Sequence, residues 1–479
     1  MHFDLFWVLM GRTAYMFAPL YLIPFAYGFL TGDPTAGSFL SLGILTAILG
    51  MVFGNMGRSH MRQLSTQEGI LFIFFVWFLP SLLGMLPFHL AGLHLSPIDT
   101  FFESISSLTT TGITTLGTVL PPTLLLWRAL MSWFGGLIFI VILVTVLPVV
   151  SGCFGLDFTV QQDRLFSPLW NRMTRSMREM TFLYIALTLV AMSIYLMAGD
   201  TIFSAIILAL FTISSGAGPM IDELPMIPSL MFGSGIVALL SALPLLTLWQ
   251  TLRRRTETKL TEHIELRFFF ILFLFAGTLL SIPPILSGTL PFSEALGQGY
   301  FYAISFLSTN GLMLQTDMRL HPSSYFLLIL LAVVGGCMGA AAGGFRLSRV
   351  LILVSLSWAE MLRTLHPHMV FSVRQRGKIV PLYSAGRILV LAFFFASVFA
   401  ISSLFLSLAG LSPIETIALT VSCLTTTGGV ASLASLSSLV DLPAWTKIIC
   451  AFLMILGRIE IFAFFLLIEF FIEKSGRKW

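Results

Sequence analysis

The sequence predicts an all-α integral membrane protein in which four tandem helix–pore-loop–helix repeats surround a central pore, preceded by an N-terminal transmembrane hairpin. Composition is the first reason: the chain is 57% hydrophobic and 10% charged, and its mean hydropathy of +0.95 excludes an ordinary soluble protein. Apolar stretches of about 20 residues recur, a length that crosses a bilayer core of roughly 30 Å. Four short polar loops rich in Ser, Thr and Gly interrupt this apolar sequence.

Hydropathy and helix-breaking residues place ten membrane-crossing helices along the chain. We expect them near residues 4–30, 37–57, 69–88, 124–148, 179–198, 228–250, 266–286, 322–357, 384–409 and 443–471. The first is followed by Gly32-Asp33-Pro34 and then by a second span, so we expect a retained helix and not a cleaved signal peptide. The eighth contains Gly335-Gly336 and the run 339–344, which should break the helix inside the membrane, where irregular backbone must line protein or water.

The spans divide into a lead hairpin and four pairs, and each pair encloses one polar loop. The expected units are the hairpin 1–60 and the pore repeats 61–155, 156–258, 259–360 and 361–479. Basic residues gather in alternate connecting segments, among them Arg58, Arg164, Arg253 and Lys474, as the positive-inside rule requires of cytoplasmic segments. Charge therefore predicts cytoplasmic N- and C-termini and an outer position for all four polar loops. The same rule explains the basic cluster after residue 252, so no nucleic-acid binding is expected.

Each polar loop is expected to follow a short half-crossing helix, over residues 97–108, 200–212, 292–307 and 413–424. The first and last loops share a lead-in, because Leu-Ser-Pro-Ile-Asp-Thr from Leu95 and Leu-Ser-Pro-Ile-Glu-Thr from Leu411 precede a Thr-Thr-Thr-Gly run at the same spacing. A dehydrated cation needs oxygens in place of its water shell. Backbone carbonyls and Ser or Thr hydroxyls supply such oxygens, and glycine permits the unusual dihedrals.

The loops therefore supply the candidate residues of a cation filter. These residues are Thr110, Thr111, Gly112, Ser214, Ser215, Gly216, Thr309, Asn310, Gly311, Thr426, Thr427 and Gly428. The alternative is ordinary packing of small residues between membrane helices, which the fourfold recurrence disfavours.

Acidic residues mark the outer sides of the half-crossing helices, and three of them are candidates for a pore mouth: Asp99, Glu103 and Glu415. Two roles stay open for them. They raise the cation concentration at the mouth, or they complement helix N-termini and stay solvated.

Arg458 lies inside the last span, where an arginine is costly and usually serves function or pairs locally. We expect its side chain to project into the pore below the filter, as an electrostatic barrier to cations. The alternative is a structural pair with Glu460 or with nearby carbonyls. Neighbours two positions apart on a helix do not face each other, which disfavours Glu460.

Enzyme chemistry is not predicted. The chain has no nucleophile elbow, phosphate-binding loop or dinucleotide fingerprint, and we expect no organic cofactor. The cysteines Cys153, Cys337, Cys423 and Cys450 lack CxxC spacing, so neither a disulfide framework nor a zinc site is expected.

Over nearly its whole length the chain resembles the TrkH/KtrB family of potassium uptake proteins, and the N-terminal hairpin makes it TrkH-like. The matching pieces are Asp99-Thr100-Phe101-Phe102-Glu103-Ser104, Leu108-Thr109-Thr110-Thr111-Gly112, Trp133-Phe134-Gly135-Gly136, Gly335-Gly336-Cys337-Met338-Gly339, Gly343-Gly344 and Gly457-Arg458-Ile459-Glu460-Ile461-Phe462.

The resemblance implies roles for these residues. It implies a potassium filter with Gly112, Gly216, Gly311 and Gly428 as filter glycines, and an intramembrane gating loop over 335–346. Gly339, Gly343 and Gly344 would belong to that gate, with Arg458 as the pore arginine beneath the filter. It also implies K⁺ as the transported ion, a prokaryotic inner membrane, a homodimer, and a cytosolic nucleotide-binding regulatory subunit of the TrkA/KtrA kind.

We therefore expect potassium uptake across the inner membrane through the four-loop filter. Two alternatives stay open. The residues beside the glycines of the second and fourth loops vary from the family pattern, which leaves room for a sodium-permeable or sodium-coupled member. A non-conducting membrane sensor is the other alternative, and a glycine in every loop argues against it.

Overall fold

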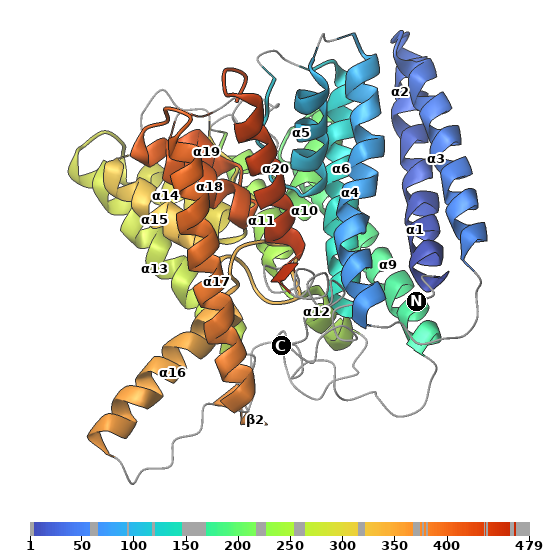
Figure 1. The fold of residues 1–479 in the computed structure, drawn as a ribbon. Helices are drawn as coiled ribbons and strands as arrows, with labels where there is room; N and C mark the ends of the chain where they lie inside the picture. The colour runs from blue at the N-terminus through green and yellow to red at the C-terminus, as the bar shows by residue number, and fades with distance from the viewer. Residues whose placement is uncertain are drawn as a thin grey trace.

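The structure, a computed structural model of the chain, is almost entirely helical (Figure 1). It describes residues 4–57, 66–92, 95–116, 120–145, 169–216, 227–252, 264–314, 321–366, 374–375, 378–379, 382–434, 436, 439–459 and 464–465. The basic residues Arg58, Arg164, Arg253 and Lys474 lie outside these ranges, so the orientation drawn from them stays a prediction.

The N-terminal hairpin packs through glycine. Its first arm is α1 (Asp4–Phe17), the 3-10 turn η1 (Ala18–Tyr21) and α2 (Leu22–Thr31), and its second arm is α3 (Ala36–Met56). A Cβ on Gly11 would lie 2.6 Å from the backbone nitrogen of Gly54, so the arms meet at backbone contact, as small residues allow in membranes. The ring of Tyr21 stacks on Trp127 with centroids 4.3 Å apart, which ties the hairpin to the next unit.

The remaining helices form four units, each with an outer helix, a short pore helix and an inner helix. The first unit is α4 (Thr66–Leu90), α5 (Pro97–Leu108) and α6 (Pro122–Thr145). The second is α9 (Leu169–Met197), α10 (Ile202–Ile213), α11 (Pro228–Ala242) and α12 (Leu245–Leu252). The third is α13 (Ile264–Leu286), α14 (Phe292–Leu307), α15 (Pro322–Val334) and α16 (Leu347–Leu365). The fourth is α17 (Leu382–Ser407), α18 (Pro413–Thr425), α19 (Gly429–Leu433) and α20 (Ala444–Ile459).

A small antiparallel pair precedes the fourth unit. Its strands are β1 (Arg374–Gln375) and β2 (Lys378–Ile379), with Arg374 opposite Ile379 and Gln375 opposite Lys378.

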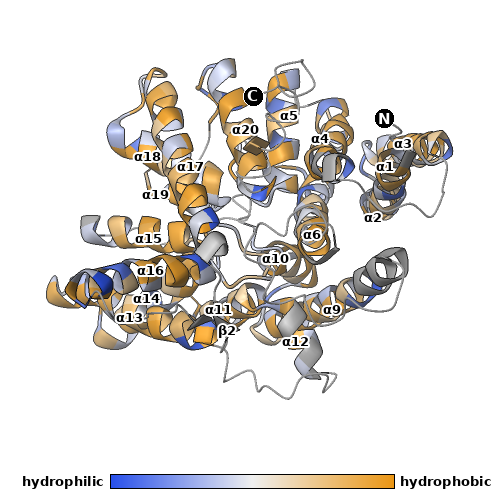
Figure 2. Ribbon diagram, turned by 60° about the horizontal axis from the view of Figure 1, so that its bottom comes forward, coloured by the Kyte–Doolittle hydropathy of each residue, from blue (hydrophilic) through white to orange (hydrophobic). Residues whose placement is uncertain are grey.

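The four units close into a ring around a common centre, with α1–α3 on the outside (Figure 2). The inner helix of each unit contacts the pore helix of the next: α6 contacts α10, α11 contacts α14, α15 contacts α18, and α20 returns to α5. This cyclic order brings the C-terminal ends of α5, α10, α14 and α18 toward one axis. The predicted all-α fold with four pore units and a lead hairpin is confirmed.

Seven helices among the described residues are long and apolar enough to cross a bilayer, against the ten expected spans. The difference lies in the inner helices. The span expected over 228–250 breaks at Leu243, which is extended (ψ 148°) before Pro244, because the residue before proline disfavours helical backbone. The eighth ends at Val334 and resumes at Leu347, as the glycine run predicts. In the last, α20 ends at Ile459, and residues 460–463 lie outside the described part of the chain.

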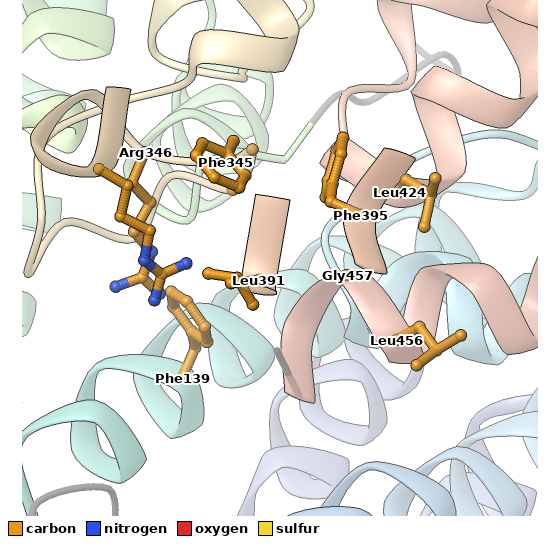
Figure 3. Close-up of a pocket in the computed structure, with 11 residues that line it drawn as sticks. Phe139, Phe345, Arg346, Leu391, Phe395, Leu424, Leu456 and Gly457 are labelled. Carbon is orange, nitrogen blue, oxygen red and sulfur yellow. The ribbon is translucent and has the colours of Figure 1, made fainter. Parts of the chain in front are cut away.

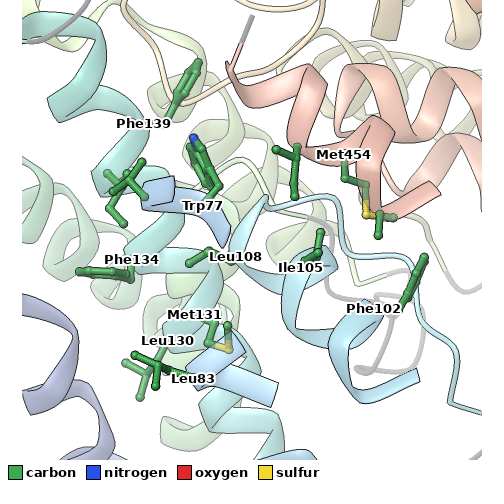
Figure 4. Close-up of a cluster of buried hydrophobic side chains, with 14 of the residues drawn as sticks. Trp77, Leu83, Phe102, Ile105, Leu108, Leu130, Met131, Phe134, Phe139 and Met454 are labelled. Atoms are coloured by element: carbon green, nitrogen blue, oxygen red, sulfur yellow. The ribbon is translucent and has the colours of Figure 1, made fainter. Parts of the chain in front are cut away.

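The first pore helix is buried on several sides at once (Figure 4). Phe102, Ile105 and Leu108 of α5 pack among Trp77 and Leu83 of α4, residues of α6, and Met454 of α20, all at most 7% exposed. The part of this pore helix from Phe102 to Leu108 is therefore enclosed by protein. The outer helices differ, since they keep large apolar side chains exposed, for example Phe182, Phe275 and Phe393.

Gly135 of α6 gives a direct test of this packing. A Cβ there would lie 1.7 Å from the carbonyl oxygen of Leu108, so Gly135→Ala must push backbone apart. We expect it to destabilise the protein by about 1–3 kcal/mol, measured as a lower melting temperature of the detergent-purified chain. The matched control is Gly297→Ala in α14, where a Cβ meets nothing within 4 Å. That control should keep or raise the melting temperature, because alanine favours helix over glycine by about 1 kcal/mol. Equal effects of the two variants would contradict the packing argument.

Candidate ion filter and gate

Each of the four polar loops contains one non-glycine residue with left-handed backbone. The φ angles are 59° at Thr110, 55° at Ser215, 58° at Thr309 and 53° at Thr426. Among the other described residues that are not glycine, Arg346 alone has a positive φ. Such a conformation costs roughly 1–2 kcal/mol per residue and persists only where the surroundings fix it. The four loops therefore share one turn, which sets a common register.

Backbone hydrogen bonds confirm this register. In three loops the residue after the left-handed one donates its N–H to the carbonyl five positions earlier: Thr111 to Ser106 at 2.9 Å, Gly216 to Phe211 at 2.8 Å, and Thr427 to Ser422 at 3.0 Å. In the third loop the N–H of Gly311 donates to the Ser305 carbonyl at 3.1 Å. These bonds satisfy carbonyls that the end of a pore helix leaves without an intrahelical donor.

The shared register places Gly216 level with Thr111, Asn310 and Thr427. This differs from the expectation that Gly216 is equivalent to Gly112, Gly311 and Gly428. In the second loop the glycine comes one residue sooner after the left-handed residue than in the other loops. Aligning the four loops by their glycines therefore places the second loop one residue out of register. Counted along the chain, the register of Gly112 falls on Ala217, which lies outside the described residues.

The three remaining candidate filter glycines do not share one backbone conformation. Gly112 and Gly311 have φ angles of 82° and 63°, a region that favours glycine. Gly428 has φ −57° and starts the short helix α19, so the fourth loop turns away at this level. At this level the first and third loops are therefore alike, and the fourth loop differs from both.

A buried ion pair stands behind the first loop. Glu103 is fully buried, and its Oε1 accepts from Thr114 Oγ1 at 2.7 Å and from the backbone N–H of Thr115. Arg128 Nη2 lies 3.4 Å from Glu103 Oε2 and donates to the carbonyls of Gly112 and Ile113, each at 3.1 Å. The structure thus places Glu103 behind the filter loop, which differs from the expectation of a solvated mouth residue. The reason is that α5 is packed on all sides, so its second turn faces protein.

Asp99 and Glu415 lie in the first turns of their pore helices, α5 and α18. Asp99 pairs with Lys447 Nζ at 2.7 Å and so joins the first and fourth units. Glu415 closes a capping box with Ser412, and the backbone N–H of Ser412 holds the pKa of that carboxyl below its ordinary value. Both carboxylates therefore complement helix starts, and a role in concentrating cations stays a prediction.

The segment 335–346 crosses the protein between α15 and α16 without regular structure, and glycine makes its path possible. Gly335, Gly339 and Gly344 have φ angles of 70°, 93° and 78°. The carbonyl of Gly339 accepts from the N–H of Leu245 at 3.1 Å, and the N–H of Met338 donates to Glu265 Oε1 at 2.7 Å. The segment is thus held by the second and third units.

This segment contacts the polar loops directly from one side. The N–H of Gly343 donates to Thr309 Oγ1 at 2.8 Å. A Cβ on Gly343 would lie 2.3 Å from the carbonyl oxygen of Thr425 and 2.4 Å from Thr426 Oγ1. Only glycine fits here, so Gly343 packs its backbone against the third and fourth loops together.

Arg458 joins the first loop to the same segment. It is 2% exposed; Nε donates to the Thr109 carbonyl at 2.7 Å, Nη1 donates to the Ala341 carbonyl at 2.7 Å, and Nη2 contacts Thr110 Oγ1. Its guanidinium also lies 4.8 Å from the ring centroid of Phe139. Arg458 therefore pairs with backbone carbonyls, one of the alternatives that the sequence left open. Glu460, the other possible partner, lies outside the described residues.

A small cavity lies between this segment and the inner helices (Figure 3). It has about 20 Å³ of space, enough for one water molecule. Its lining combines the apolar side chains of Phe139, Phe345, Leu391 and Phe395 with two arginines, Arg346 and Arg349. The guanidinium of Arg346 lies 5.1 Å from the ring centroid of Phe139.

The pair behind the first loop can be tested by neutralising one partner. Glu103→Gln leaves Arg128 as a buried charge without its counter-ion, which costs about 3–5 kcal/mol. We expect a clearly lower melting temperature, partly recovered in the double variant Glu103→Gln/Arg128→Gln. The matched control is Glu294→Gln, at the exposed start of α14, which should leave the melting temperature unchanged. A double variant less stable than either single variant would contradict an ion pair.

Several known proteins are similar to this chain over most of its length. The TrkH family, described as cation transport protein, matches residues 246–477. The Trk system potassium uptake protein TrkG of Escherichia coli K12 is 30% identical over 86% of this chain and 87% of its own length. TrkH of Halomonas elongata is 29% identical over 95% of this chain and 96% of its own. The crystal structure of the potassium transporter TrkH from Vibrio parahaemolyticus shares the fold, with a TM-score of 0.86 at 24% identity over 97% of this chain and 98% of that one. The chain belongs to the TrkH family of cation transport proteins.

Proposed function

We propose that this chain takes up potassium across a prokaryotic inner membrane, with the four polar loops as selectivity filter and the segment 335–346 with Arg458 as gate. The observation that carries the proposal is the left-handed residue repeated at the end of all four pore helices, around one axis. Relatives that cover nearly the whole chain are named potassium uptake proteins, which supports K⁺ as the ion.

The pore helices favour a cation. Four helix C-termini, those of α5, α10, α14 and α18, point toward one axis, and each carries the negative end of a helix dipole. The loops add carbonyls and hydroxyls, the oxygen ligands that replace a potassium hydration shell. Arg128 and Glu103, both fully buried, hold the first loop in place, so its oxygens need little reorganisation when an ion arrives.

The gate acts at the innermost hydroxyls of the filter. Thr110 Oγ1 is occupied by Arg458 and Thr309 Oγ1 by the N–H of Gly343. The hydroxyls of Ser215 and Thr426 are buried without a hydrogen-bond partner among the described residues. Opening then requires Gly343 to move away from Thr309 and Arg458 to move away from Thr110. The hydroxyls of all four left-handed residues then face a passing ion. The positive charge of Arg458 raises the barrier further while it stays.

The unit boundaries and partners belong to the same proposal. The hairpin is residues 1–60, and the pore repeats are 61–155, 156–258, 259–360 and 361–479. We propose a homodimer that binds a cytosolic nucleotide-binding regulatory subunit of the TrkA/KtrA kind. Helix α16 extends obliquely away from the bundle (Figure 1), and its exposed Trp358, Met361 and Leu365 favour contact with another protein or with lipid.

A sodium-permeable transporter is the second candidate. It is favoured by the asymmetry of the filter, in which Gly216 stands one register early and Gly428 starts a helix. A less uniform ring of oxygens discriminates less between the two ions.

Uptake of ⁸⁶Rb⁺ and ²²Na⁺ into proteoliposomes tests the filter. We expect rubidium uptake by the native chain and its loss in Gly112→Ser, because a side chain at φ 82° strains the filter loop. Gly410→Ser is the matched control: it has the same φ of 82°, and a Cβ there meets nothing within 4 Å. Sodium uptake alone would assign the sodium alternative, and no flux of either ion, with or without a regulatory subunit, would contradict conduction.

The same assay tests Arg458 as a barrier. Arg458→Ala removes the charge and the link between filter and gate, so we expect rubidium uptake to rise about tenfold, as a barrier lowered by about 1.4 kcal/mol gives. Arg363→Ala on the exposed part of α16 serves as control and should leave uptake unchanged. Uptake that is unchanged in Arg458→Ala would rule out the barrier role.

A further inference from the structure

In three of the four candidate filter loops, a side-chain contact joins the residue before the left-handed residue to the residue after it. We call this contact the clasp. In the first loop Thr109 Oγ1 and Thr111 Oγ1 lie 2.9 Å apart. In the third, Asn310 Nδ2 donates to Ser308 Oγ at 3.0 Å. In the fourth, the hydroxyls of Thr425 and Thr427 lie 3.1 Å apart. The clasp spans the left-handed residue, so it holds that residue in its strained backbone conformation.

The second loop cannot form this clasp from its own residues. Its hydroxyl before the left-handed position is Ser214 Oγ, but the residue after that position is Gly216, which has no side chain. Ser132 of α6 stands in this place instead. Its Oγ lies 2.9 Å from Ser214 Oγ, and a Cβ on Gly216 would lie 2.3 Å from Ser132 Oγ.

The direction of the hydrogen bond between Ser132 and Ser214 agrees with Ser132 taking the place of the side chain that Gly216 lacks. Ser214 Oγ lies 2.8 Å from the Phe211 carbonyl and 2.9 Å from the Leu210 carbonyl, so its one hydrogen is used within the pore helix. Ser132 therefore donates to Ser214. In the third loop, Asn310 likewise donates to the hydroxyl of Ser308, while Ser308 Oγ donates to the Ser305 carbonyl at 3.1 Å.

Helix α6 is shaped to bring Ser132 to this position. One turn along, a Cβ on Gly136 would lie 2.9 Å from Ser214 Cβ, so glycine lets α6 approach the loop. Ser132 is 1% exposed and has no contact with solvent. The same helix holds the first loop through Arg128, so one rigid element sets the position of two neighbouring loops.

We propose that Ser132 is a positioning residue of the ion filter, which supplies from α6 the clasp that Gly216 cannot supply to the second loop. The inference rests on the proposed function for its effect on ion selection. It assigns a filter role to a helix residue outside all four loops. It also accounts for Gly216, since any side chain there collides with the hydroxyl that replaces it.

A hydroxyl swap tests the proposal. Ser132→Ala removes the clasp, and we expect the Rb⁺ to Na⁺ uptake ratio in proteoliposomes to fall about fivefold, as the loss of one hydrogen bond gives. Gly216→Thr alone puts a Cβ against Ser132 Oγ and should lower both uptake and melting temperature. The double variant Ser132→Ala/Gly216→Thr moves the hydroxyl onto the loop, as in the first and fourth loops. It should restore the ratio to within about twofold of the native one, less than half the cost of one hydrogen bond.

The control is Ser81→Ala, which removes a buried serine that donates within its own helix, to the Trp77 carbonyl, and should leave the ion ratio unchanged. Melting temperatures of the same variants give a readout that needs no transport. If the native chain carries neither ion, the proposed function fails, but the clasp is still decided by whether the double variant melts above Gly216→Thr. An unchanged ion ratio in Ser132→Ala, or a double variant that melts no higher than Gly216→Thr, would overturn the proposal.

Discussion

A helix that ends inside a membrane leaves its last carbonyls without donors, and lipid offers none. Four pore helices of this protein end in that way around one axis, and each is followed by one residue with left-handed backbone and by a backbone N–H that returns to the end of the helix. The N–H groups of Thr111, Gly216 and Thr427 donate back to carbonyls of their own pore helices. The contacts around the four loops hold this turn in place, because non-glycine residues adopt left-handed backbone only where their surroundings fix it.

The inner helices provide that constraint by coming unusually close. Gly135 in the first unit and Gly457 in the fourth both face the carbonyl of the leucine two positions before the left-handed residue, Leu108 and Leu424. The next residue then faces the loop of the neighbouring unit: Gly136 meets Ser214, and Arg458 meets Thr109 and Thr110. Arg458 therefore occupies a contact position that the first unit fills with glycine.

The ring is built from equivalent parts that are individually adjusted. Arg128 and Glu103 brace the first loop, Ser132 supports the second, Ser241 accepts from Asn310 Nδ2 at 2.9 Å in the third, and the fourth runs into α19. In three of these cases the support comes from an inner helix. A single chain with four unequal repeats can vary one support at a time, which a tetramer of identical subunits cannot do.

The sequence by itself determined the membrane class, the outer and pore helices, the four polar loops and the break in the eighth span, because these follow from hydropathy, proline, glycine and helix caps read over short windows. In the structure, the lead-in that the first and fourth loops share supplies helix caps at Ser96 and Ser412. Only the tertiary structure decided the register of Gly216, the burial of Glu103 and the partners of Ser132 and Arg458. The contacts that settle the last two join residues 82 and 349 positions apart, and no local pattern records which distant hydroxyl or carbonyl a folded chain will bring within hydrogen-bonding distance.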